Sequence, residues 1–220
     1  MRTRIIVVVI VFLIAAGWFF FPVWEPKGES LSFALRLALP AAILAFGGIG
    51  LISWLMTFGF VFCTIGDTMG VMGSFEGQMA GFALAHVCFI SYFVKCIRES
   101  KALPAVLITT SLLCSLPLVL AAKEVIPRIK DLPIKIGCFV YALLLTGTVW
   151  TSIVKAFSTK ERMKTLHLLA AMGGLLFLVS DFVLSWNKFT EHIPHASLYI
   201  MTTYYAALLL LFVGTHKTKS

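Results

Sequence analysis

The chain has 220 residues, of which 60% are hydrophobic and 13% are charged, and its mean hydropathy is +0.97. These values exclude an ordinary soluble domain and predict an all-α, polytopic membrane protein with one integral membrane domain over residues 1–220. The formal net charge of +8 does not indicate a nucleic-acid partner, because the basic residues lie in short loops between hydrophobic runs, where they orient membrane spans.

Eight hydrophobic runs approach the ~20 residues that a helix needs to cross a ~30 Å hydrocarbon core. The uncharged run Leu37–Gly66 is too long for one span, and Gly47-Gly48-Ile49-Gly50 inside it predicts a tight turn. The first run ends in bulky residues with no small-residue cleavage site, which favours a retained helix over a signal peptide. The predicted transmembrane helices are Ile5–Val23, Leu31–Phe46, Leu51–Met72, Gln78–Phe93, Ala102–Ala122, Ile134–Val154, Thr165–Trp186 and Ala196–Val213, the second and fourth being short.

The distribution of Lys and Arg predicts the topology, because cytoplasmic loops carry an excess of them. With eight spans, the side that holds both termini has 11 basic residues: Arg2, Arg4, Lys95, Arg98, Lys101, Lys155, Lys160, Arg162, Lys164, Lys217 and Lys219. The other side has 7: Lys27, Arg36, Lys123, Arg128, Lys130, Lys135 and Lys188. This difference favours cytoplasmic termini.

Two aspartates, Asp67 and Asp181, lie inside otherwise uncharged hydrophobic segments. A carboxylate near the bilayer centre costs roughly 2.5–3.5 kcal/mol on insertion scales, so such residues are usually retained for function. Each lies about five residues before the predicted end of its helix, which puts both ~7–8 Å below the outer helix ends. Equal depth predicts one shared site, although a lone aspartate that bonds a neighbouring helix remains an alternative.

The two aspartates are four spans apart and therefore have the same orientation, which allows a weak four-plus-four helix duplication. Gly59 and Gly173 each lie eight residues before an aspartate, in keeping with such a repeat. His86 is a third candidate, since a short turn between the third and fourth helices would bring its height within ~4–5 Å of that of Asp67. A buried histidine that merely joins two helices is the plainer alternative.

Three further residues are candidates for binding substrate. Tyr204 is predicted near mid-membrane, where a phenol needs a partner, either a catalytic carboxylate or a backbone carbonyl. Asn187 and Lys188 are predicted at headgroup depth, where a lysine can meet a lipid phosphate or simply extend to the interface. His192 and His195 lack a third ligand, and the five cysteines form no CxxC pair, so neither a metal site nor any other cofactor is predicted.

The sequence resembles the YhhN family of membrane proteins, the lysoplasmalogenases, in two blocks that cover about a third of the chain. The first block is Gly66-Asp67-Thr68-Met69 with Gly81-Phe82-Ala83-Leu84-Ala85-His86; the second is Gly173–Asp181 with Lys188-Phe189 and Thr203-Tyr204-Tyr205-Ala206. Two positions depart from the family pattern, which has a tyrosine where Phe89 stands and a glutamine where Ala207 stands. Either departure would affect activity if the lost polar group positions substrate or water.

The resemblance implies hydrolysis of the vinyl ether bond of lysoplasmalogens, with a lysophospholipid substrate drawn from the bilayer. Opening an enol ether needs a proton donor and a group that stabilises an oxocarbenium ion or activates water, the division of labour used by glycosidases. Asp67 and Asp181 would be that acid/base pair, with His86 as orienter or relay. Family members occupy either the bacterial cytoplasmic membrane or the endoplasmic reticulum, and the absence of a retrieval signal at the last residues favours the bacterial membrane.

Two other classes of protein stay open. A proton-coupled transporter would also place aspartates inside the membrane, and Pro40 and Pro117 mark helices that could be interrupted as in carriers. A non-catalytic membrane scaffold is the third. The sequence contains no GxSxG motif, so serine-based lipase chemistry is unsupported. Headgroup preference and oligomeric state leave no sequence signal.

Overall fold

The computed structural model describes residues 2–20, 31–100, 104–158 and 161–217, and this part of the chain is helical, with no strand. The eight α-helices of these ranges are α1 (Arg2–Phe20), α2 (Leu31–Gly47), α3 (Trp54–Val71), α4 (Phe75–Ser100), α5 (Pro104–Glu124), α6 (Leu132–Phe157), α7 (Glu161–Phe189) and α8 (Ala196–Thr215), with a 3-10 turn η1 (Ile126–Arg128) before α6. All except α2 are long and apolar enough to cross a membrane, and α2 is a shorter apolar helix.

The turn predicted between the second and third helices is confirmed. Helix α2 ends at Gly47, and α3 begins at Trp54. Gly50 has a φ of 80°, a left-handed conformation that glycine adopts without steric cost. The prediction of a short fourth helix is wrong, because α4 has 26 residues. Its polar ends, which include Lys95 and Arg98, continue the helix beyond the apolar run, so hydropathy alone underestimated its length. The end predicted for the first helix, at Val23, lies outside the described residues.

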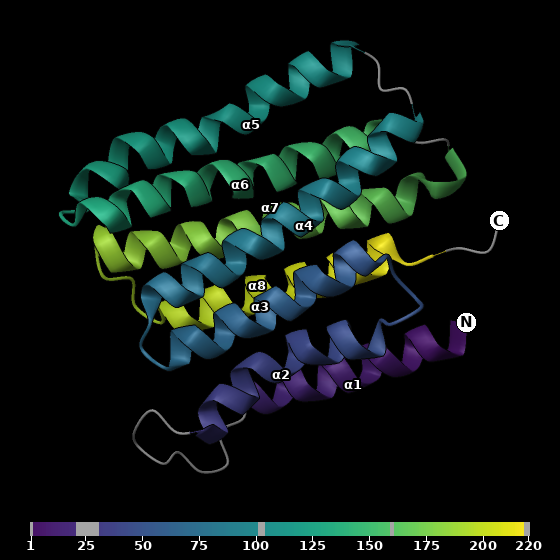
Figure 1. The fold of residues 1–220 in the computed structure, drawn as a ribbon, viewed down its shortest axis with the longest axis horizontal. Coiled ribbons are helices and arrows are strands. Elements are labelled where there is room, and N and C mark those ends of the chain that lie inside the picture. Colours follow the sequence, from purple (N-terminus) through teal and green to yellow (C-terminus); the bar gives the residue numbers. More distant parts are fainter. Residues whose placement is uncertain (1, 21–30, 101–103, 159–160, 218–220) are drawn as a thin grey trace. The chain divides into compact units, whose positions relative to one another are not determined.

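The first compact unit comprises residues 1–88 and 216–220. Within it α1 packs against α2 and α2 against α3, as Figure 1 shows. A tight turn joins α3 to α4: Gly73 has a φ of 80°, and the backbone N–H of Ser74 donates to the carbonyl of Met69 at 3.0 Å. This arrangement satisfies carbonyls at the end of α3 and makes α3 and the start of α4 an antiparallel hairpin.

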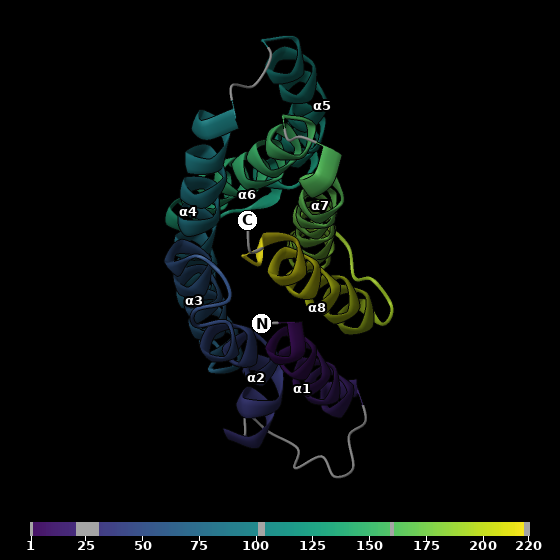
Figure 2. The same ribbon diagram turned by 90° about the vertical axis from the view of Figure 1, so that its right-hand side faces the viewer.

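The second compact unit comprises residues 89–215, so the division falls within α4. Within it α5 packs against α6, α6 against α7 and α7 against α8. Figures 1 and 2 show α7 and α8 side by side. In the α7–α8 contact the ring of Phe177 packs against Tyr204, and a Cβ added to Gly173 would lie 2.8 Å from the backbone nitrogen of Leu211. Consecutive packing of antiparallel helices is the up-and-down arrangement of helical bundles.

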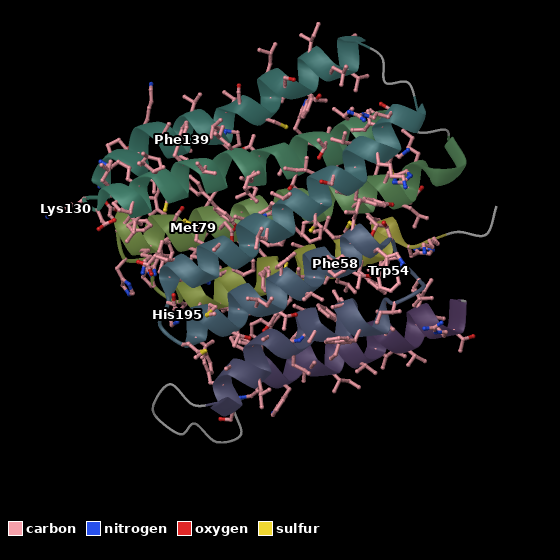
Figure 3. The ribbon with its side chains drawn as sticks, in the orientation of Figure 1. Trp54, Phe58, Met79, Lys130, Phe139 and His195 are labelled. Carbon is pink, nitrogen blue, oxygen red and sulfur yellow. The ribbon has the colours of Figure 1, made fainter. Side chains whose placement is uncertain are left out.

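Large apolar side chains point outward from both units, as the sticks in Figure 3 show. Trp54 and Phe58 on α3 are more than half exposed, and Phe139 on α6 is 42% exposed. Soluble monomers rarely expose contiguous apolar surface on this scale, whereas a lipid-facing surface requires it. The chain is therefore an integral, multi-pass membrane protein.

Candidate active site

Asp67 lies beside a point where α3 and α4 touch backbone to backbone. A Cβ added to Gly81 would lie 2.7 Å from the Cα of Gly66, and one added to Gly66 would lie 3.1 Å from the carbonyl oxygen of Gln78. Gly66 belongs to a GxxxG pair with Gly70, and Gly81 to one with Gly77, the spacing that lets two membrane helices approach closely. Asp67 directly follows this crossing and is only 3% exposed.

The same crossing fixes the register between Asp67 and His86. Gly66 is level with Gly81, Asp67 is one residue beyond this level, and His86 is five residues beyond it in the opposite direction. The two side chains are thus six residues apart in height, or about 9 Å at helical rise. The predicted 4–5 Å was too small because it assumed that the hairpin was symmetrical about Phe75. His86 is fully buried.

Asp181 lies on α7 in the second unit and is 9% exposed. The phenol of Tyr141 on α6 donates a hydrogen bond to its Oδ2 atom. The preceding residue, Ser180, donates from its hydroxyl to the carbonyl oxygen of Ile200 on α8, at 3.0 Å. Residues of two neighbouring helices, α6 and α8, therefore hold this segment of α7, and the carboxylate has a donor on one oxygen.

Tyr141 is not among the site residues predicted from the sequence. The available signal was a lone phenol inside the otherwise apolar sixth helix, where its hydroxyl must find a partner. Its partner is 40 residues away in sequence, so no local spacing indicated the pair. A phenol can orient a carboxylate and stabilise its negative charge, which makes Tyr141 a positioning residue for Asp181.

The predicted equal depth of the two aspartates does not match the helix ends of the structure. Asp67 lies four residues before the end of α3, whereas Asp181 lies eight residues before the end of α7. At helical rise these are about 6 Å and about 12 Å. The prediction ended the seventh helix at Trp186, but α7 continues to Phe189, and the N–H of Thr190 still donates to the carbonyl of Trp186.

The three predicted substrate-binding residues have different surroundings. Tyr204 is buried on α8, and its ring centroid lies 5.3 Å from that of Phe177. Phe177 lies about one turn before Asp181 on α7. The side-chain oxygen of Asn187 accepts a hydrogen bond from the N–H of Ile193 at 2.8 Å, so it holds the α7–α8 loop. Lys188 is exposed, and its ammonium lies 5.9 Å from the ring centroid of Phe189.

His192 and His195 lie in the loop between α7 and α8, where Figure 3 labels His195. The described residues contain no group of three His, Cys, Asp or Glu side chains arranged to hold a metal ion.

Buried aspartates at helix contacts inside a multi-pass bundle define a class of membrane protein in which intramembrane carboxylates do the chemistry or carry an ion. A model of the YhhN family matches residues 30–215. The chain therefore belongs to the YhhN family.

Several animal relatives are similar over most of the chain. It is 31% identical to human "Lysoplasmalogenase TMEM86B" over 199 residues, covering 87% of this chain and 79% of that protein. It is 28% identical to the mouse protein of the same name over 92% of this chain and 84% of that protein. The bovine "Lysoplasmalogenase TMEM86A" is 27% identical over 73% of this chain and 65% of its own length. No solved structure matches.

Proposed function

We propose that this chain is a lysoplasmalogenase, a membrane hydrolase that converts lysoplasmalogens to a fatty aldehyde and glycerophosphoethanolamine or glycerophosphocholine. Family membership and relatives of that name support the activity. The observation that carries the chemistry is the buried carboxylate of Asp181, held by the phenol of Tyr141. A carboxyl group that is oriented and kept from bulk water can serve as a general acid or base.

The reaction proceeds by protonation of the vinyl ether. A carboxylic acid donates its proton to the β-carbon of the enol ether, and the α-carbon becomes an oxocarbenium ion. A second carboxylate stabilises this cation and removes a proton from the water that adds to it. The resulting hemiacetal collapses into a fatty aldehyde and the glycerol hydroxyl, so that one water is consumed and the catalytic proton is returned. Glycosidases use two carboxyl groups around a similar cation.

We assign the two carboxyl roles to Asp67 and Asp181. Both are buried, and each follows a small residue that contacts the next helix. Gly66 of α3 contacts α4, and Ser180 of α7 bonds α8. His86, at the height described above, would relay protons.

The remaining features of the proposal concern substrate and membrane. Tyr204, whose ring packs against Phe177 one turn before Asp181, would line the path of the alkenyl chain. Lys188 and the amide N–H groups of the Asn187 side chain would meet the headgroup. We further propose eight spans with both termini in the cytoplasm, and the bacterial cytoplasmic membrane as the location.

A proton-coupled carrier is the competing function. Carriers of this kind bind substrate where spanning helices are interrupted. Helices α2 and α5 contain Pro40 and Pro117, yet each continues through its proline as one helix. The continuity of these two helices favours the enzyme.

The test is aldehyde release from lysoplasmenylethanolamine and lysoplasmenylcholine by purified protein, for wild type, Asp67→Asn and Asp181→Asn. Asp131→Asn is the matched control, because Asp131 caps α6 by accepting from the N–H of Ile134, and asparagine is an equally good N-cap. We expect wild-type release from the control and loss of about 100-fold or more in the other two variants.

Two outcomes would change the proposal. Full hydrolysis by folded Asp67→Asn and Asp181→Asn would remove both aspartates from the mechanism. Uptake of the lysolipid into liposomes without any aldehyde would replace the enzyme with a carrier.

A further inference from the structure

Arg36 is a buried cation that the proposed reaction does not use. It lies in the apolar helix α2 of the first unit and is only 6% exposed. From the sequence it is one of the basic residues that set topology, but a topology signal needs only to lie at a membrane interface in contact with water. Burial against protein requires a different explanation.

Within the described ranges, no acidic side chain pairs with Arg36. Its guanidinium carbon lies 6.0 Å from the ring centroid of Phe33, one turn earlier on α2. A guanidinium carries five N–H donors and keeps its charge at any physiological pH, so its burial without an anion is costly. A buried guanidinium of this kind can bind an anionic ligand.

Arg36 lies at the same end of the first unit as Asp67. Helices α2 and α3 are antiparallel neighbours joined by the turn between Gly47 and Trp54. Arg36 is 11 residues before Gly47 and Asp67 is 13 residues after Trp54. Counted along the two helices from this turn, the two Cα atoms therefore differ by two residues, or about 3 Å of helical rise. Side chains on a helix lean toward its N-terminus, which carries the guanidinium toward Phe33 and the level of Asp67.

We propose that Arg36 binds the phosphodiester of the lysophospholipid substrate. This inference rests on the proposed function, because it assigns the headgroup end of that same substrate. The planar guanidinium can donate two parallel hydrogen bonds to phosphate oxygens, and the Phe33 ring supports it from one side. Only the glycerol backbone separates this phosphate from the vinyl ether, so a phosphate bound at Arg36 presents the reactive bond near the depth of Asp67.

The test measures binding separately from catalysis. The probe is 1-O-alkyl-lysophosphatidylcholine, a saturated ether that has no double bond to protonate, and its partner is 1-O-alkylglycerol, which lacks the phosphate. Affinities are measured for purified wild type, Arg36→Gln and Arg36→Lys. Arg128→Gln is the control, because Arg128 is an exposed cation paired with Glu124 in the second unit. Inorganic phosphate is added as a competitor, and thermal unfolding reports on folding.

We expect Arg36→Gln to weaken binding of the phospholipid probe about tenfold or more, without changing binding of the alkylglycerol. The affinity of Arg36→Lys for the phospholipid probe should lie between those of wild type and Arg36→Gln. Lysine keeps the charge but cannot donate two parallel hydrogen bonds. Inorganic phosphate should compete weakly, because it lacks the apolar chain; displacement at equal concentration would mean that the site takes free phosphate instead of a lipid.

Equal affinity of wild type and Arg36→Gln for the phospholipid would overturn the inference, as would an equal loss for both probes, which would show a structural role. If Arg36→Gln does not fold, Arg36→Lys is compared with wild type instead. A wild-type preference of Arg36→Lys for the phospholipid probe over the alkylglycerol would likewise overturn the inference. If wild type binds the phospholipid probe through Arg36 but releases no aldehyde, the phosphate site is supported and the proposed hydrolysis is refuted.

Discussion

Replacing Gly81 with alanine should separate activity from stability, because this residue sets the contact that carries Asp67. The added Cβ would lie 2.7 Å from both the Cα and the N of Gly66, whereas ordinary contacts begin at 3.4 Å. These are backbone atoms, so no side chain can rotate away. Helices α3 and α4 must therefore move apart by about 1 Å, a distance at which misplaced catalytic groups lose on the order of 100-fold in rate.

The stability cost of this substitution should be small by comparison. Overpacking costs typically about 1–3 kcal/mol. Alanine recovers about 1 kcal/mol over glycine through its helix propensity. The net loss is thus about 0–2 kcal/mol, which for a chain of this size lowers Tm by at most about 8 °C. The expected variant is folded and slow.

The assay is kcat for aldehyde release, measured with Tm in the same detergent. Gly17→Ala is the matched control, because Gly17 lies on α1 and a Cβ added there meets nothing within 4 Å. The control should keep wild-type kcat and an equal or higher Tm. A Gly81→Ala protein with wild-type kcat would show that the α3–α4 crossing does not position Asp67 for the reaction.

Two other substitutions test contacts in the second unit. Tyr141→Phe removes the hydrogen bond to Asp181 and should lower kcat about 10- to 100-fold, the range for a bond to a charged group, while Tyr199→Phe, at an exposed position, should match wild type. A Tyr141→Phe enzyme with unchanged kcat would remove Tyr141 from the site. Asn187→Ala removes the bond to the N–H of Ile193 and should lower Tm by about 2–4 °C, the effect of about 1 kcal/mol. If Asn187→Ala instead raises KM with Tm unchanged, Asn187 binds substrate and does not hold the loop.

The sequence predicted the helices well because a hydrocarbon core imposes one length on every span. The turn at Gly47–Gly50 was predicted for the same reason, since no single helix could hold the uncharged run around it. The ends of α4 and α7 were not predicted, because polar residues beyond the core can continue a helix without changing its hydropathy signal. The end of α7 set the height inferred for Asp181. The height difference between Asp67 and His86 was wrong for a different reason, because the hairpin was taken as symmetrical about Phe75, whereas Gly66 is level with Gly81.

The site residues divide in a similar way. Asp67 and Asp181 were predicted because a carboxylate in an apolar helix is unusual by itself. Tyr141 and Arg36 were not assigned to the site, because their significance depends on what faces them across a helix contact. A phenol in an apolar helix is common, and an arginine five residues from a helix end reads as an orientation signal. Only the buried surroundings of Arg36 and the partner of Tyr141 distinguish them from those ordinary cases.

The two aspartates share a structural context that explains why small residues precede both. Gly66 allows α4 to contact the backbone of α3, and Ser180 bonds the carbonyl of Ile200 on α8. A close helix neighbour excludes lipid chains and water from the next residue, and it makes each carboxylate depend on a rigid helix pair. A carboxyl group in such a position can hold a proton out of contact with bulk water, which is what protonation of a weakly basic carbon requires. The small residue before each aspartate is therefore as much a part of the proposed chemistry as the carboxylate itself. Replacing it with a larger residue should lower the reaction rate before it prevents folding.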